Sequence, residues 1–170
     1  MLEKVGLGGS CYWCTEAIFS SLIGVKNVQQ GWLNSFDDQE WFSEGVLLQF
    51  DTQLIKLDDL IEIHLKTHSA TSNHSRRGKY RSAVYCESIA QIEATKSIIA
   101  RLQGDFGKAI ITQPLLLNEL KLSPEQYQNY YYSDPSKPFC QNQIAPKLLK
   151  LIEQFNDKVD HKIINKALDK

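Results

Sequence analysis

The sequence predicts an α+β fold, a two-layer sandwich in which helices pack on a mixed β-sheet with a ferredoxin-like core. Two observations carry this prediction. Strand-like runs alternate with stretches of helical spacing, but in short and unequal pieces, unlike the even units of a doubly wound nucleotide fold. The stretch GLGGS at 6–10 also lacks the third glycine of the dinucleotide-binding fingerprint.

Apolar periodicity assigns the elements of the N-terminal half. Strand-like runs show alternating or continuous apolar residues, whereas helical stretches show an apolar residue every three or four positions. Gly24 ends the first helix, and the polar stretch 34–40 is a loop. The predicted strands are 4–9, 25–33 and 46–51, and the predicted helices are 12–22 and 57–68.

The C-terminal half continues the alternation less regularly. Pro114 breaks a β-like run at 108–120, and Pro146 precedes the last long helical stretch. Ser123 is a helix N-cap, with proline and glutamate in the first turn, and that helix ends before Pro135. The other predicted elements are a strand at 80–86 and helices at 89–102 and 147–155.

The composition is that of an average globular chain. Of the 170 residues, 42% are hydrophobic and 23% charged, with a net charge of -1 and a pI near 6.4. No basic excess indicates nucleic acid or anionic lipid as a partner, and no apolar run approaches the ~18 residues of a membrane span. The N-terminus MLEKVGLGG has no signal-type apolar region. We expect a cytoplasmic chain with neither nucleic acid nor membrane as a partner.

Four cysteines carry the candidate chemistry, and two of them stand three apart in GGSCYWCTE. If a helix begins near Cys11, the unpaired N–H groups of its first turn favour the thiolate of that residue. Cys14, one turn later, can then condense with a sulfenic acid on Cys11 to give a disulfide. Alternatively, either thiol is an ordinary buried side chain. Cys86 ends a strand and is expected in the core, and Cys140 lies in a predicted loop as a spare resolving thiol or an inert one.

A metal site is the other alternative. His64 and His68 are four apart, share a helix face, and with Cys11 and Cys14 make a possible tetrahedral zinc set. The long separation between the cysteines and the histidines is unlike zinc-finger spacing. We therefore expect no metal.

Tyr12 and Trp13 separate the two cysteines. Sulfur contacts aromatic rings favourably, so an adjacent aromatic pair can wall a small apolar pocket for an alkyl sulfur group. The alternative is that Trp13 packs inward, and both can hold at once.

The segment SCYWCTE at 10–16 resembles the signature of the A-type peptide methionine sulfoxide reductases. That signature is glycine, the catalytic cysteine, Phe-Trp, then Gly or Cys, and a glutamate two residues on; here serine replaces the glycine and tyrosine the phenylalanine. The resemblance covers about residues 4–150, in the family's order. It continues through LIGV (22–25), SEGVLLQFD (43–51), KYRSAVY (79–85), YQNYY (127–131) and FCQNQIAPKL (139–148).

The resemblance implies a role for each matching residue. Cys11 attacks the sulfoxide sulfur, Tyr12 and Trp13 receive the methyl group, Glu44 protonates the sulfoxide oxygen, and Tyr80 hydrogen-bonds that oxygen. A leaving oxygen does need a proton donor, and a carboxyl in an apolar pocket has a raised pKa. From the residues alone, Glu44 is equally well a surface charge.

The resemblance also implies the remaining partners of the reaction. Cys14 matches the cysteine that closes the disulfide, which leaves Cys140 as a secondary resolving candidate. A thioredoxin-like protein then reduces the disulfide, and no cofactor is implied. Glu16 competes with Glu44 for the acid role by proximity, but we expect it to be a structural residue of the helix.

Three departures from the family pattern bear on the site. The stretch 31–43 is short and lacks the family's second oxygen-binding tyrosine; it offers only Trp32, Phe36 and Trp41. The family's aspartate before its GTQYRS stretch is absent, and Arg76 and Arg77 either change the charge there or are solvated loop charges. Tyr127 stands where the family has a histidine, and we expect it to line the substrate pocket or to pack.

Together these inferences predict one catalytic domain over 1–155, followed by a polar, helical C-terminal tail over 156–170. The expected activity is reduction of the S epimer of methionine sulfoxide, free or in peptides. The alternative from another class is an impaired homologue that binds a methionine or sulfoxide partner without turnover, and the zinc domain ranks last.

Overall fold

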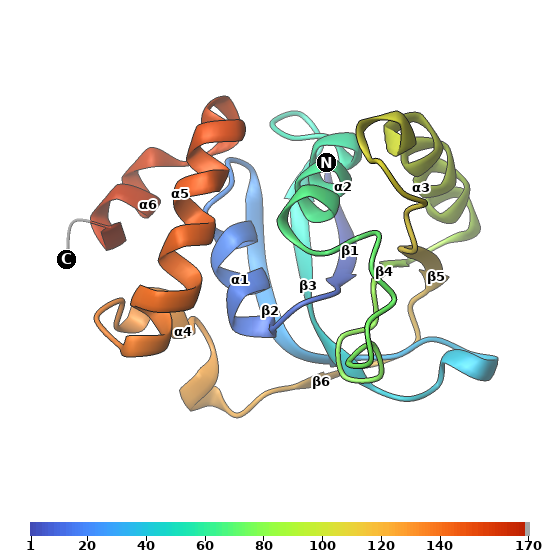
Figure 1. The fold of residues 1–170 in the computed structure, drawn as a ribbon, viewed down its shortest axis with the longest axis horizontal. Helices are drawn as coiled ribbons and strands as arrows, with labels where there is room; N and C mark the ends of the chain where they lie inside the picture. The colour runs from blue at the N-terminus through green and yellow to red at the C-terminus, as the bar shows by residue number, and fades with distance from the viewer. Residues whose placement is uncertain (169–170) are drawn as a thin grey trace.

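The computed structural model describes residues 1–168 (Figure 1). Its centre is a six-stranded mixed sheet in the order β5-β4-β1-β3-β2-β6. All neighbouring strands are antiparallel except β4 and β5, which are parallel. The strands are β1 (Leu2–Gly8), β2 (Val25–Leu33), β3 (Ser43–Asp51), β4 (Ala83–Cys86), β5 (Gln113–Leu116) and β6 (Leu120–Leu122).

The helices pack mainly on one face of the sheet, which confirms the predicted α+β sandwich (Figure 1). Short 3-10 turns and one π-helical turn, Cys140–Ile144, connect some of them. The helices are α1 (Tyr12–Ser20), α2 (Leu57–Thr67), α3 (Ile89–Leu102), α4 (Tyr130–Ser133), α5 (Ala145–Gln154) and α6 (His161–Leu168). Among the described residues, no helix has the length and apolarity that a membrane crossing needs.

The main core forms where alternate residues of the central strands face the helices. Leu7 of β1 stands opposite Val46 of β3 on one side and Val84 of β4 on the other, and all three are fully buried. Because side chains alternate across a strand, these register pairs lie on one face. The opposite face carries a smaller cluster around Leu33 and Tyr85, covered by the segment 115–120.

Pro114 does not break a strand, contrary to the sequence-based expectation. It lies inside β5, which is an edge strand. Gln113 donates its backbone N–H to the Ser82 carbonyl, and Leu117, directly after β5, donates its N–H to the Cys86 carbonyl. The backbone N–H groups of odd-numbered residues in this segment therefore point toward β4. The missing N–H of Pro114 therefore points outward, where an edge strand tolerates it.

The predicted helix from Ser123 is also wrong. The segment forms a single 3-10 turn at Glu125–Tyr127 and then the four-residue α4, separated by Asn129 in the left-handed region at φ 55°. The Ser123 hydroxyl does not cap a helix. It donates to the Gln30 side chain instead, at 2.8 Å. Tertiary hydrogen bonds therefore override the local capping signal.

The C-terminal segment packs on the body of the protein. Val159 forms an isolated β-bridge with Leu22, and Ile164 of α6 is fully buried. The proposed boundary after residue 155 stays a prediction.

Candidate active site

Cys11 occupies the N-cap of α1, between the end of β1 and the first helical turn. The side chain of Cys14 is the main cause that lowers the pKa of the Cys11 thiol to about 7, and the backbone N–H groups of Trp13 and Cys14 add to the effect. Burial and the nearby Glu44 carboxylate act in the opposite direction. Near neutral pH, a large share of Cys11 is therefore the nucleophilic thiolate.

The same contact raises the pKa of Cys14, with burial as the second cause. Cys14 is 2% exposed, so it remains a protonated thiol that donates its hydrogen to Cys11. All four cysteines lie in the described part of the chain, and all four are free thiols. The pair is thus a thiolate beside a thiol, as the spacing predicted.

The chain reaches Cys11 through Gly8 and Gly9. The Gly8 carbonyl accepts a hydrogen bond from His64 Nε2 at 2.8 Å, and the Gly9 carbonyl accepts one from Arg77 Nη1 at 2.8 Å. Gly9 has φ 151°, and a Cβ there would lie 2.5 Å from the His68 ring. Only glycine fits this approach, which fixes the direction in which the chain enters α1.

Glu44 of β3 lies beside this first turn. Its carboxylate is 4% exposed; Oε1 accepts a hydrogen bond from the Tyr12 backbone N–H at 3.2 Å. Oε2 lies 3.5 Å from Lys79 Nζ. Burial raises the pKa of Glu44, whereas the Tyr12 N–H and the Lys79 ammonium lower it. The Glu44 carboxyl is therefore buried beside the first turn of α1 and is not a surface charge.

Tyr12 and Trp13 begin a cluster of aromatic rings. The two rings lie 5.7 Å apart, and Tyr12 also lies 5.6 Å from Trp32. Trp13 stacks on Tyr130 at 3.9 Å with an interplanar angle of 7°, and the ring of Tyr127 lies 5.7 Å away. Trp13 therefore packs inward, as one of the two expectations held, and the expected pocket wall stays a prediction.

The aromatic cluster also includes three rings that the sequence analysis did not predict as substrate contacts: Trp32, Tyr130 and Phe139. Phe139 meets Trp13 edge-on at 5.4 Å. Trp32 stands directly opposite Glu44 in the β2–β3 register, so its ring lies on the same face of the sheet as the carboxylate. The strand alternation at 25–33 was the signal that would have placed Trp32 there.

Tyr80 lines a cavity of about 530 Å³ together with Cys11 and Cys14. Its ring lies 5.2 Å from Lys79 Nζ and 5.6 Å from the Arg76 guanidinium. The structure thus brings the predicted residues Cys11, Cys14 and Tyr80 to one opening.

Glu16 is a structural residue. Its buried carboxylate accepts hydrogen bonds from the backbone N–H groups of Asn129 at 2.8 Å and Tyr130 at 3.0 Å, and from the Gln30 amide at 2.8 Å. These bonds hold the segment that carries Tyr127 and Tyr130 against α1. The Glu16 carboxylate is thus engaged by three protein donors.

His64 and His68 both bond to protein partners, His64 through Nε2 alone, because its buried Nδ1 has no partner among the described residues. His68 Nδ1 donates to the His64 carbonyl, and His68 Nε2 accepts from the Ser82 hydroxyl at 2.8 Å. Burial lowers the pKa of His64, and it lowers the pKa of His68 to about 4, so both rings are neutral at pH 7. Within residues 1–168, no group of three or more histidine, cysteine or acidic side chains is placed to hold a metal ion. The zinc alternative therefore finds no support.

Two loop expectations are corrected. Arg77 is not a solvated charge, because it donates to the carbonyls of Ser69, Ser72, Gly9 and Tyr80 and so ties the loop 69–80 to the residue that follows β1. Cys140 is not in a loop. It begins the π-helical turn before α5 and is fully buried.

Comparison with a family profile and comparison with known sequences find the same family. The family profile described as peptide methionine sulfoxide reductase matches residues 3–159. The chain is 34% identical to "Peptide methionine sulfoxide reductase MsrA" of Trichodesmium erythraeum, over 94% of this chain and 99% of that protein.

Solved structures share the fold. Methionine sulfoxide reductase A of Corynebacterium diphtheriae superposes with a TM-score of 0.70 at 20% identity, covering 79% of this chain and 76% of the other. Mxr1 from Saccharomyces cerevisiae, in complex with Trx2, gives a TM-score of 0.58 at 19% identity over 74% of this chain and 83% of the other.

Proposed function

Because the chain belongs to the peptide methionine sulfoxide reductase family, we propose that it reduces the S epimer of methionine sulfoxide, free or in peptides, to methionine. The single observation that carries this proposal is the arrangement around Cys11. A thiol with its pKa lowered to about 7 stands beside a second thiol and a buried carboxyl.

The first step transfers oxygen. The Cys11 thiolate attacks the sulfoxide sulfur, Glu44 supplies a proton to the oxygen, and the oxygen passes to the cysteine sulfur. Methionine leaves with two more electrons on its sulfur, and Cys11 becomes a sulfenic acid. Burial raises the pKa of Glu44, which increases the protonated fraction that this step needs. Tyr80 donates its hydroxyl hydrogen to the same oxygen.

The aromatic rings bind the methyl group. Tyr12 and Trp13 form the floor, and Tyr127 closes the side next to Trp13. The indole N–H of Trp13 is buried and has no acceptor among the described residues. It is free to donate a hydrogen bond to the bound substrate.

The second step restores a disulfide. The Cys14 sulfur attacks the Cys11 sulfenic sulfur, water leaves, and a Cys11–Cys14 disulfide forms. A thioredoxin-like dithiol then reduces this disulfide by exchange. The complex of the yeast relative Mxr1 with Trx2 supports this choice of reductant. Cys140 is a reserve resolving thiol. The cycle needs thiols kept reduced, so we place it in the cytoplasm.

The ion pair of Glu44 favours a second candidate, a homologue that binds sulfoxide without turnover. Lys79 Nζ lies 3.5 Å from the Glu44 carboxylate and stabilises its ionised form, which cannot supply a proton. In addition, no tyrosine stands in 31–43. This candidate predicts sulfoxide binding with no methionine released.

A single-turnover experiment tests the cycle. The reduced protein is mixed with excess blocked methionine sulfoxide and no reductant, and both released methionine and disulfides are measured by mass spectrometry. The proposal predicts about one methionine per protein and a Cys11–Cys14 linked peptide, neither of which forms with Cys11→Ser. Binding without methionine would favour the second candidate.

A further inference from the structure

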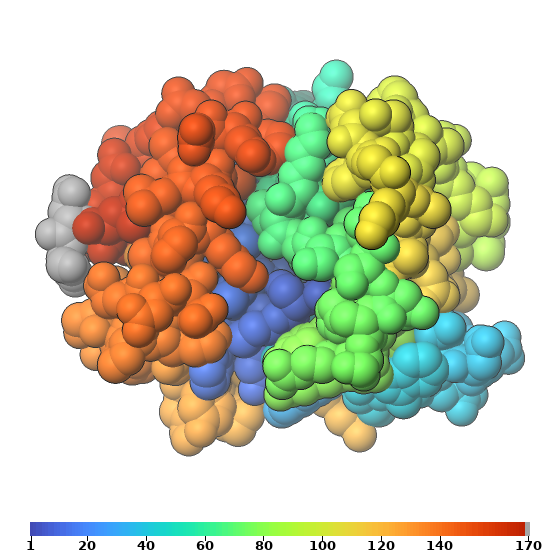
Figure 2. All heavy atoms as spheres, in the orientation of Figure 1, coloured from blue at the N-terminus to red at the C-terminus, as the bar shows by residue number. Residues whose placement is uncertain are grey.

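The cavity lined by Cys11, Cys14 and Tyr80 also includes residues of α2 and α5, and it forms a groove on the surface. Its walls are the end of α2 with the following loop on one side and α5 on the other, and Cys11 and Cys14 are part of its lining. Figure 2 shows this hollow, with the blue N-terminal segment on its floor between the green segment near residue 70 and the orange segment near residue 145. Glu44, Tyr12 and Trp13 do not line it.

The groove is strongly basic. Its lining includes four cationic side chains, and none of its lining residues within 1–168 is acidic. Lys66 is partly neutralised, because it pairs with Asp105 at 3.4 Å and Glu62 at 3.9 Å. The other three cations have no ion pair with a carboxylate of the described residues; they are Arg76, Lys147 and Lys150.

The charges of Lys147 and Arg76 affect the ionisation of groups near Cys11. The charge of Lys147 favours the ionised form of Cys14 and disfavours protonation of His68. The charge of Arg76 favours the ionised form of Glu44. The groove therefore belongs electrostatically to the same site, although its four cationic side chains have no part in the proposed chemistry.

We propose that this groove binds acidic residues of a peptide that flank the methionine sulfoxide, so that the enzyme prefers oxidised methionines in acidic segments. The inference rests on the proposed function. Unpaired cations lining a concave surface attract carboxylates, and the concavity fits a peptide chain better than the surface of a folded partner. Phe139 and Leu151 supply apolar contacts in the same lining.

Three blocked pentapeptides test the proposal, each with methionine sulfoxide between pairs of aspartates, asparagines or lysines. With dithiothreitol as reductant, no protein partner is involved. We expect kcat/KM for the aspartate peptide to exceed that for the asparagine peptide by about three- to tenfold at low salt, and the lysine peptide to be the poorest. The preference should fall toward one at about 0.5 M salt, because the groove is open to solvent.

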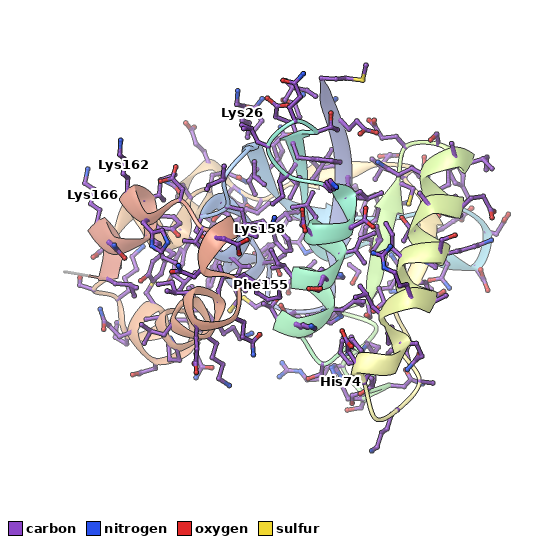
Figure 3. All side chains as sticks on the ribbon, turned by 90° about the horizontal axis from the view of Figure 1, so that it is seen from above. Lys26, His74, Phe155, Lys158, Lys162 and Lys166 are labelled. Atoms are coloured by element: carbon purple, nitrogen blue, oxygen red, sulfur yellow. The ribbon has the colours of Figure 1, made fainter. Side chains whose placement is uncertain are left out.

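The double variant Lys147→Gln/Lys150→Gln should abolish most of this preference. The matched control is Lys162→Gln/Lys166→Gln, which removes the same charge from α6. Figure 3 shows these two lysines at the edge of the molecule away from His74, another lining residue of the groove. The control should keep the preference. Equal kcat/KM for aspartate and asparagine peptides, or equal losses in both double variants, would overturn the proposal.

Other outcomes distinguish a failure of the proposed function from a failure of the groove proposal. If none of the peptides is turned over, the proposed function fails. The groove proposal is then tested by binding alone: the Cys11→Ser variant should bind a fluorescent aspartate peptide more tightly than the asparagine peptide, and equal affinities would overturn it. A preference for free methionine sulfoxide over every blocked peptide would assign the groove to an amino-acid carboxylate. If Lys147→Gln/Lys150→Gln loses activity only when thioredoxin is the reductant, the groove would be assigned to binding of the reductant. Both results would contradict binding of acidic peptides.

Discussion

The carboxylate of Glu44 accepts a hydrogen bond from the backbone N–H of Tyr12, at 3.2 Å, and so joins β3 to the first turn of α1. This bond places the carboxyl next to the Cys11 sulfur, because Tyr12 directly follows the cysteine. The nucleophile and the proposed proton donor are therefore positioned by the backbone rather than by flexible side chains.

The first prediction concerns Glu44→Gln. The amide keeps the shape and still accepts from Tyr12, but it cannot supply a proton. We expect kcat/KM for methionine sulfoxide to fall by about 100-fold or more. Far-UV circular dichroism should be unchanged. The control is Glu40→Gln, an exposed carboxylate that precedes β3 in the chain; equal effects in the two variants would remove Glu44 from the mechanism.

Lys79→Gln should move the pH profile. The Lys79 ammonium lowers the pKa of Glu44, so its removal raises that pKa and enlarges the protonated fraction at neutral pH. The limb of kcat/KM that falls as the acid ionises should shift to higher pH. Lys108→Gln, an exposed lysine elsewhere, should leave the limb in place. A shift to lower pH in Lys79→Gln would contradict the account.

Cys14→Ala should weaken the nucleophile as well as remove the resolving thiol. The Cys14 side chain is the main cause of the lowered Cys11 pKa, so the alkylation midpoint of Cys11 should rise from about 7 toward its ordinary value of 9.0. Rates of iodoacetamide alkylation against pH give this midpoint. Cys140→Ser should keep the native midpoint and the Cys11–Cys14 disulfide. An unchanged midpoint in Cys14→Ala would show that the helix alone activates Cys11.

His68 makes the fold acid-sensitive. Its folded-state pKa is about 4, below the ordinary 6.5, so the unfolded chain binds more protons between these values. Stability is therefore lost as pH falls from about 6.5 to 4, by roughly 1.4 kcal/mol per pH unit at most from this group. Urea unfolding at several pH values measures the slope. His68→Gln should reduce the slope but not abolish it, because the pKa of His64 is also lowered by burial, whereas His161→Gln, an exposed histidine, should leave the slope unchanged.

Much of the site was predictable because its signals are local. The spacing of Cys11 and Cys14, with glycines before them, indicated a thiolate at a helix N-terminus. The strand next to Glu44 was visible as an apolar run at 46–51, although β3 already begins at Ser43 and only the resemblance to the family gave this carboxyl a role.

What escaped prediction depends on contacts between distant segments. The Ser123 cap signal lost to hydrogen bonds with Gln30, 93 residues away in sequence. Arg77 acts through the carbonyl of Gly9 and carbonyls of its own loop, which no sequence pattern marks. The basic groove likewise combines lysines of α2 and α5 that periodicity alone does not bring together.

Turnover of the two separate epimers of a blocked methionine sulfoxide, with dithiothreitol as reductant, tests the central claim most directly. The native protein should reduce only the S epimer, and Cys11→Ser should reduce neither. If the native protein turns over neither epimer, or if Cys11→Ser retains activity, then the thiolate at the start of α1 is not the nucleophile of a sulfoxide reductase.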